Sequence, residues 1–147
     1  DARGAKRRSS IMTARWWRWV WVRLLPVMVA MGGLFYLSHQ PGDSFTLPEG
    51  YNIDKVLHCL VYMILGVTFY VALSPEWRVR QPFLAGCATV LFCLCYGMFD
   101  EWHQSFIVGR YASGSDVVAD VGGGFLAVAC ECGWRRWRGA TMGEAVG

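Results

Sequence analysis

Residues 96–120 read YGMFDEWHQSFIVGRYASGSDVVAD and join two apolar segments of the chain. The first segment ends in Asp100 and Glu101, a short loop carrying Arg110 follows, and the second segment begins with Asp116 and Asp120. Ionisable residues at the ends of membrane helices are costly and usually serve a purpose. Because these acids stand where two long apolar segments reach water, we expect them to form one polar site in a membrane protein.

The whole chain is rich in apolar residues and poor in charge. Of its 147 residues, 54% are hydrophobic and 17% are charged, whereas soluble domains carry about 25% charged residues. Four apolar segments approach the roughly 20 residues that cross a bilayer, at about 18–37, 54–73, 83–103 and 116–133. The sequence therefore predicts an all-α membrane protein, with four transmembrane helices in a compact bundle.

The remaining residues define the borders of this single domain. We expect residues 1–11 to be a disordered leader ahead of a natural start at Met12, residues 12–138 to be the membrane domain, and residues 139–147 to be a disordered tail. Small residues recur every fourth position in the last two segments, which permits close helix approach and leaves homo-oligomers open. They are Ala85, Thr89, Cys93 and Gly97, then Ala119, Gly123 and Ala127.

Basic residues predict which ends of the helices face the cytoplasm. Lys and Arg in short loops mark the cytoplasmic side. They gather before the first segment, in the loop 74–81 and after the fourth segment: Arg15, Arg18, Arg23, Arg78, Arg80, Arg135, Arg136 and Arg138. The other two loops and helix ends carry only Lys55 and Arg110. Both termini are therefore expected in the cytoplasm, and the acidic helix ends outside, in the cytoplasmic (inner) membrane of a bacterium.

Helix spacing places the polar residues of three helices on inward faces. Residues three or four apart share a helix face, and a carboxylate that faces lipid is expensive. We therefore expect one site at the outer membrane face. Its members are Asp54, Lys55, His58, Tyr62, Asp100, Glu101, Gln104, Arg110, Asp116 and Asp120.

Within this set, chemistry suggests separate roles. Asp100, Glu101 and His58 are the candidates for acid and base catalysis. Arg110 and Lys55 are suited to holding a phosphate. Crowded carboxylates need neutralising cations, so a divalent metal is one candidate cofactor, with Asp54, His58 and Glu101 as its candidate ligands.

Structural roles for the same residues stay open. Asp116 and Asp54 stand at helix starts, where they would cap a helix, and Asp54 would pair with Lys55. His58 would form a structural hydrogen bond with Asp54. Capping does not explain Asp100 and Glu101, because the dipole disfavours acids at a helix C-terminus.

The order of these residues resembles the VanZ-like family. The resemblance rests on Asp54-Lys55-x-x-His58-x-x-x-Tyr62, Asp100-Glu101-x-x-Gln104, Gly109-Arg110 and Asp116-x-x-x-Asp120, preceded by Ser38-x-Gln40-Pro41-Gly42. It implies a small polytopic membrane protein, adds Gln40 to the candidate ligand-binding residues, and suggests a link to resistance against the glycopeptide teicoplanin. Asp120 departs from the pattern, because many members of the family carry Asn there.

Three functions fit this reading. The first is binding or modification of a lipid-linked envelope molecule, by phosphoryl or glycosyl-phosphoryl chemistry if the protein is an enzyme. The second is a non-catalytic protein that shields envelope precursors or the antibiotic. The third is a small transporter, for which the chain offers only Tyr62, Thr68 and Thr89 near the middle of the bilayer. The expected partners are membrane lipids or a lipid-linked precursor, and no nucleic acid.

Overall fold

The computed structural model describes residues 2–42 and 53–144, and its regular elements there are α-helices. They are α1 (Ala2–Ser38), α2 (Ile53–Ala72), the short α3 (Pro75–Arg80), α4 (Pro82–Gln104) and α5 (Gly114–Glu144). Four helices are long and apolar enough to cross a membrane, over Val20–Ser38, Ile53–Ala72, Pro82–Gln104 and Gly114–Thr141. The predicted all-α fold with four membrane helices is confirmed.

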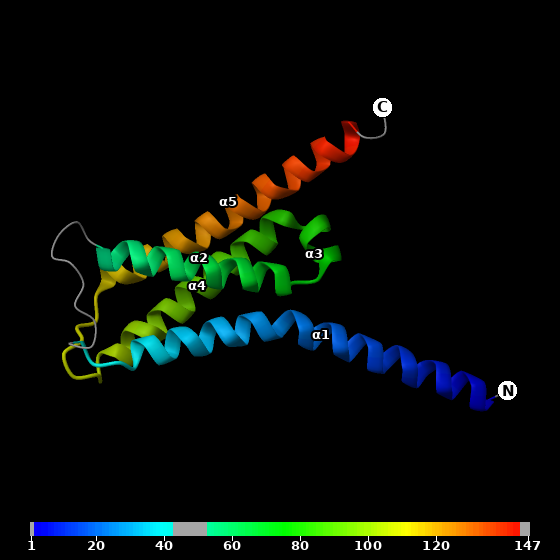
Figure 1. Ribbon diagram of the computed structural model, residues 1–147, viewed down its shortest axis with the longest axis horizontal. Coiled ribbons are helices and arrows are strands. Elements are labelled where there is room, and N and C mark those ends of the chain that lie inside the picture. Colours follow the sequence, from blue (N-terminus) through cyan, green and yellow to red (C-terminus); the bar gives the residue numbers. More distant parts are fainter. Residues whose placement is uncertain (1, 43–52, 145–147) are drawn as a thin grey trace.

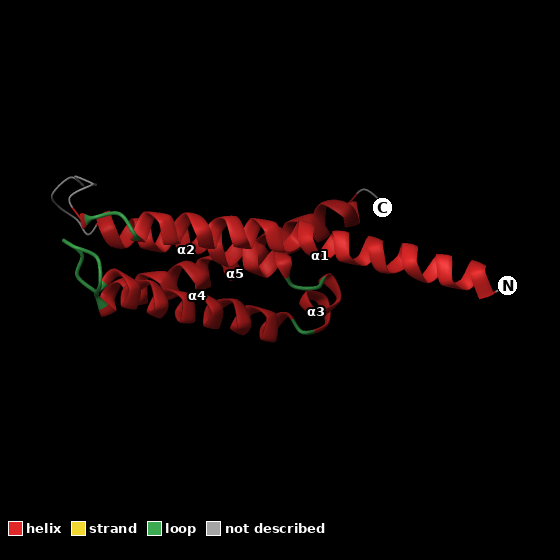
Figure 2. Cartoon of the chain, turned by 90° about the horizontal axis from the view of Figure 1, so that it is seen from below, coloured by secondary structure: helices red, strands yellow, loops and turns green. Residues whose placement is uncertain are grey.

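The helices are arranged around the pair formed by α2 and α5. These two make the most extensive contact, α4 packs against α5, and α1 reaches the bundle mainly through α2. The two chain ends lie toward one end of the bundle, and the connection from α4 to α5 lies at the other (Figures 1 and 2). This arrangement follows from an even number of spans and brings the polar ends of three helices together.

The first and the last helix of the chain are longer than predicted. Helix α1 begins at Ala2, so residues 2–11, which we expected to be disordered, are helical. Helix α5 continues to Glu144, so residues 139–144 of the expected tail are helical too. Neither region contains a proline that would stop a helix. Part of the expected charge pattern rests on Arg15 and Arg18. The structure describes the backbone of these two residues but not their side chains.

The connection between α2 and α4 contains a helix that we did not predict. Helix α3 is capped by Ser74, whose Oγ accepts a hydrogen bond from the Trp77 amide at 3.1 Å. Pro75 occupies its first turn and Pro82 that of α4, which suits the fixed φ of proline. The two helix starts reverse the chain within a few residues.

The stripes of small residues form the contact faces of α4 and α5. Ala85, Thr89 and Cys93 are completely buried, as is Ala127 on α5. A side chain at Gly123 would overlap the α2 backbone, because its Cβ would lie 2.7 Å from the amide nitrogen of Met63. The predicted close packing is confirmed, and it lets buried polar groups of neighbouring helices touch directly.

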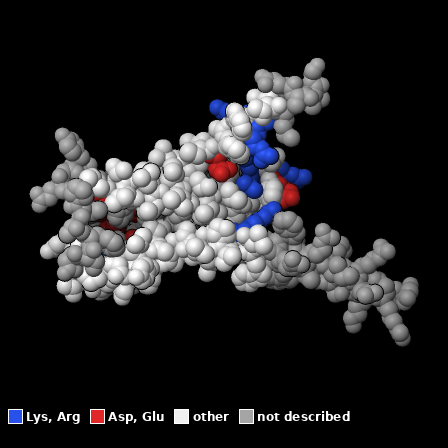
Figure 3. All heavy atoms as spheres, in the orientation of Figure 1, with Lys and Arg blue, Asp and Glu red and all other residues white. Residues whose placement is uncertain are grey.

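Charge separates the two ends of the bundle. Arginine side chains gather at the end that carries α3, while acidic side chains lie recessed at the opposite end (Figure 3). At the basic end, the guanidinium groups of Arg78 and Arg135 lie 5.7 and 5.4 Å from the ring centre of the buried Tyr70. The arginines, with Glu76 of α3 among them, therefore lie at the end of the bundle opposite to the recessed carboxylates (Figure 3).

Candidate functional site

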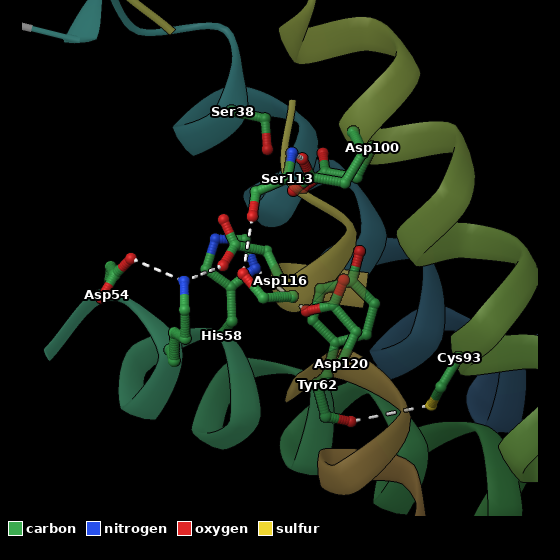
Figure 4. Close-up of polar contacts among 12 residues, drawn as sticks. Ser38, Asp54, His58, Tyr62, Cys93, Asp100, Ser113, Asp116 and Asp120 are labelled. Atoms are coloured by element: carbon green, nitrogen blue, oxygen red, sulfur yellow. Dashed lines mark hydrogen bonds and ion pairs between the residues drawn. The ribbon is translucent and has the colours of Figure 1, made fainter. Parts of the chain in front are cut away.

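The recessed acidic end is built where α2 begins, α4 ends and α5 begins. Helix α2 contributes Asp54 and His58, α4 contributes Asp100 and Glu101, and α5 contributes Asp116. Side chains of all three helices converge in Figure 4. The sequence-predicted residues are therefore brought together from segments that are up to about 60 positions apart, and the expected inward orientation holds for most of them.

A buried carboxylate fixes the histidine of the site. Asp120 is 0% exposed, and its Oδ1 accepts a hydrogen bond from Nδ1 of His58 at 2.9 Å. It fits there because Gly97 of α4 has no side chain, and a Cβ at that position would lie 2.6 Å from Asp120 Oδ2. Tyr62 lies nearly parallel to the imidazole, with ring centres 6.4 Å apart. With Nδ1 carrying the proton, Nε2 of His58 presents its lone pair to another partner.

Asp120 thus replaces the partner that we had considered for His58. We weighed a structural pair between His58 and Asp54, but the structure joins His58 to Asp120 on α5. Asp54 instead pairs with Lys55. The exchange follows from the close contact of α2 and α5, which helix spacing within α2 alone does not reveal.

One lysine bonds two carboxylates at the rim of the site. Lys55 Nζ donates to Asp116 Oδ1 at 2.7 Å and to Asp54 Oδ2 at 3.1 Å. The side chain of Asp116 is 13% exposed, whereas that of Asp54 is 49% exposed. Lys55 therefore ties α2 to α5 and leaves Asp54 at the surface.

Glu101 is a buried carboxylate with one engaged oxygen. It is 5% exposed, and its Oε2 accepts a 2.6 Å hydrogen bond from the backbone amide of Ser113. Its other oxygen, Oε1, is buried without a hydrogen-bond partner in the described parts of the chain, as is Oδ2 of Asp120. A buried acceptor that lacks a partner costs about 1–3 kcal/mol, so these two oxygens call for a ligand or a proton.

Asp100 and Gln104 form a separate buried pair on α4. Gln104 Nε2 donates to Asp100 Oδ2 at 2.9 Å and lies 3.5 Å from Ser38 Oγ at the end of α1. This pair connects the site to α1. Ser38, which begins the Ser38-x-Gln40-Pro41-Gly42 motif, and Ser113 complete the polar network. We had not singled out Ser113, because a single serine carries no distinguishing pattern in the sequence.

Arg110 is directed to the end of α1 rather than to a carboxylate. Its Nε donates to the carbonyl oxygen of Gln40 and its Nη2 to that of Leu37, both at 3.2 Å. Gly109 precedes it with a φ of 76°, which favours glycine and turns the loop back toward α1. Gln40 itself uses its side-chain amide to bond the carbonyl of Tyr36. The phosphate-holding role expected for Arg110 and Gln40 stays a prediction.

A pair of histidines lies beside this network. His39 Nδ1 and His103 Nε2 are 3.4 Å apart, and the ring of Phe35 stacks on that of His103 with centres 4.6 Å apart. Their contact joins the ends of α1 and α4, and their separation in the sequence hides it.

The site opens into a cavity of about 230 Å³ between α1, α2 and α4. Its polar side is formed by Ser38, Asp54, His58, Asp100, Gln104 and Arg110. Its apolar side is formed by Leu34, Leu37, Leu57 and Val61. Leu37 and Leu57 are 45% and 42% exposed, so the apolar wall continues to the outer surface of these membrane helices. The cavity is shaped for an amphiphilic molecule.

Side chains from three helices bring potential metal-ligand atoms near one another. One ligand atom each of His58, Glu101 and Asp116 lies within 4.8 Å of the others. We had expected Asp54 in place of Asp116. The structure favours Asp116 because Asp54 sits at the rim, half exposed, beside Lys55. His58 and Glu101 are the two expected ligands that the fold does bring together.

Fold and site together define a small polytopic membrane protein with a carboxylate- and histidine-lined pocket at one end of its helices. The sequence model of the VanZ/LLP1 family matches residues 7–134. The chain belongs to this family. No curated protein and no solved structure matches it.

Proposed function

We propose that this protein binds a lipid-linked phosphate of the bacterial envelope at the pocket between α1, α2 and α4. The observation that carries the proposal is the two-sided cavity, with the polar groups of Asp54, His58 and Arg110 at one end and leucines along its wall. A lipid headgroup needs hydrogen-bonding partners, whereas its chain needs an apolar path into the bilayer. Leu37 and Leu57 provide that path, because both are partly exposed on the helix surface.

The charge pattern supports an outer-leaflet location for the headgroup. Arg78 and Arg80 lie in α3, Arg135 and Arg136 lie in the C-terminal part of α5, and both groups are at the end of the bundle opposite to the pocket (Figure 3). Basic loops stay in the cytoplasm, so the pocket faces the extracytoplasmic side of the cytoplasmic membrane. Envelope precursors carried on polyprenyl phosphates are exposed there, and these precursors are the molecules on which glycopeptides act. The link to teicoplanin tolerance that the family resemblance suggests is part of this proposal.

The described groups suit binding directly and leave room for chemistry. His58 and Asp100 line the pocket. Glu101 belongs to the adjoining group of possible metal ligands, together with His58. A histidine held by Asp120 is oriented to exchange a proton at Nε2. If the bound carrier is modified, phosphoryl or glycosyl-phosphoryl transfer is the reaction class that this set supports.

Site-specific photocrosslinking tests the binding. A photoreactive amino acid at Leu57, in the wall of the pocket, is compared with one at Leu91, which is 58% exposed on α4. Crosslinked lipids are identified by mass spectrometry after illumination of living cells. We expect polyprenyl-phosphate carriers to be enriched at position 57 over position 91, whereas bulk phospholipids react at both. Equal lipid patterns at the two positions would refute the proposal.

A resistance assay separates a catalytic from a shielding role. Glu101→Gln and Asp100→Asn change charge but little shape. If the site acts on its ligand, these variants lose teicoplanin tolerance at normal expression. If it only shields a precursor, tolerance survives both changes and depends on the outer loops instead. A purified protein that converts a polyprenyl-phosphate substrate would decide in favour of catalysis.

A further inference from the structure

We infer that His58, Glu101 and Asp116 bind a divalent transition-metal ion such as Mn²⁺ or Zn²⁺. The starting observation is geometric, because ligand atoms from three different helices lie within 4.8 Å of one another. Ligands of one metal ion at about 2.1 Å stand roughly 3 to 4.2 Å apart. Small side-chain rotations close the difference.

The histidine is already prepared as a ligand. Its Nδ1 is held at 2.9 Å by the fully buried Asp120, and this fixes the tautomer in which Nε2 is free to coordinate. Carboxylate–histidine–metal arrangements of this kind orient the ring and raise its basicity. Asp120 is therefore a positioning residue, and its charge would strengthen the bond between His58 and the ion.

The second observation is the buried oxygen of Glu101. Glu101 is 5% exposed, one oxygen is held by the Ser113 amide, and Oε1 has no partner within the described residues. The hydrogen bond to Ser113 holds the carboxylate in place, so that Oε1 meets a ligand without a further loss of side-chain freedom. A carboxylate oxygen in this state points to a cation or a proton.

Charge balance favours a cation over protons alone. Five carboxylates lie at this end of the bundle, and the cations beside them are Lys55 and Arg110. The carboxylates are those of Asp54, Asp100, Glu101, Asp116 and Asp120. In the described parts of the chain, the guanidinium of Arg110 donates its hydrogen bonds to backbone carbonyls. Lys55 holds one oxygen of Asp116 and also serves Asp54. A divalent ion would offset most of the remaining negative charge.

The ligand set selects the class of metal. One imidazole with two carboxylates suits Mn²⁺ or Zn²⁺, whereas Mg²⁺ and Ca²⁺ prefer oxygen ligands throughout. The inference deepens the proposed function, because an ion held by three protein ligands keeps positions open for phosphate oxygens. It also removes a conflict, since a phosphate would otherwise approach a group of carboxylates.

Mn²⁺ binding to the detergent-purified, chelator-treated protein tests the inference without any lipid. Free Mn²⁺ is measured by electron paramagnetic resonance, and Zn²⁺ is then added as a competitor. We expect one saturable site per chain in the wild-type protein, with affinity lowered at least about tenfold by Glu101→Gln or Asp116→Asn. Asp54→Asn is the matched control, because Asp54 also pairs with Lys55 but stands outside the ligand group. The Mn²⁺ affinity of the Asp54→Asn protein should change less than about threefold.

Thermal unfolding keeps the test independent of folding defects. Bound metal raises the Tm of a protein by mass action, so Mn²⁺ should raise the Tm of the wild-type protein and Asp54→Asn but not that of Glu101→Gln. The absence of saturable binding in the wild-type protein, or equal losses in Asp54→Asn and Glu101→Gln, would overturn the inference. Metal binding that persists while no polyprenyl phosphate is crosslinked at Leu57 would refute the lipid proposal and leave the metal site standing.

Discussion

Replacing Gly123 with alanine should weaken the contact on which the whole site depends. A Cβ at this position would lie 2.7 Å from the Met63 amide nitrogen and 2.9 Å from Tyr62 Cβ, and would also overlap the carbonyl oxygen of Cys59. These atoms belong to the α2 backbone or to its first side-chain carbon, so none of them is able to rotate away. The Cys59 carbonyl oxygen is the nearest of these atoms, so restoring an ordinary contact of 3.4 Å requires α2 and α5 to separate locally by about 1 Å.

Two opposing effects determine how much Gly123→Ala changes the free energy of unfolding. Overpacking of a tight contact costs about 1–3 kcal/mol, while replacing a glycine in a helix by alanine returns up to about 1 kcal/mol. We therefore expect a net destabilisation of about 1–2 kcal/mol for Gly123→Ala. For a chain of this size, that corresponds to a fall in Tm of roughly 2–8 °C.

Tryptophan fluorescence during thermal unfolding in detergent measures this shift. Gly133→Ala is the control in the same helix, because a Cβ there has nothing within 4 Å. It should leave the Tm unchanged or raise it slightly, since only the propensity effect remains. A Gly123→Ala protein that melts at or above the wild-type temperature, or that shifts in the same direction as Gly133→Ala, would refute the packing argument.

Three further changes test the polar site and one tests its location. Asp120→Asn should keep most of the Mn²⁺ affinity, because an amide oxygen still accepts from His58, whereas Asp120→Leu should lower it more than tenfold; equal titration curves would contradict this. Ser113→Pro removes the amide that holds Glu101 and should cost about 1–3 kcal/mol in thermal unfolding, but Ser113→Ala should not, so equal losses would refute the contact. Lys55→Met removes a competing cation from Asp116 and should raise Mn²⁺ affinity; weaker binding would show that Lys55 supports the site. A reporter enzyme active only outside the cytoplasm should be inactive when fused at the C-terminus and active when inserted after Gln104, and the reverse pattern would invert the topology.

Much of the fold could be predicted because a helix that crosses a membrane requires a long apolar segment, which is easy to recognise in a sequence. Four apolar segments gave the four spans, and only their ends moved when α1 and α5 continued beyond the apolar residues. Small residues at every fourth position predicted contact faces, and the burial of Ala85 and Ala127 confirmed them. In lipid, few side chains other than small ones allow two helices to approach closely, so this pattern is specific.

The site was predictable as a group of residues but not as a set of pairs. Periodicity fixes the face of one helix, yet it does not fix how far one helix is shifted along its neighbour. For this reason a structural pair between His58 and Asp54 on the same helix was one of the open alternatives, while the partner of His58 is Asp120 on α5. The same shift brings Asp116 rather than Asp54 beside Glu101 and His58. Ser113 was missed because its contribution is a backbone amide, which every residue but proline possesses.

The glycine contacts and the buried acids explain each other. Asp120 reaches complete burial because Gly97 leaves space for its carboxylate and Gly123 lets α5 lie directly on α2. Close packing buries Oε1 of Glu101 and Oδ2 of Asp120, and neither oxygen has a hydrogen-bond partner in the described parts of the chain. Each lowers the stability of the ligand-free protein by about 1–3 kcal/mol. A bundle that only needed stability would be better served by apolar residues at these positions, which agrees with a site that a cation or a proton completes at Glu101.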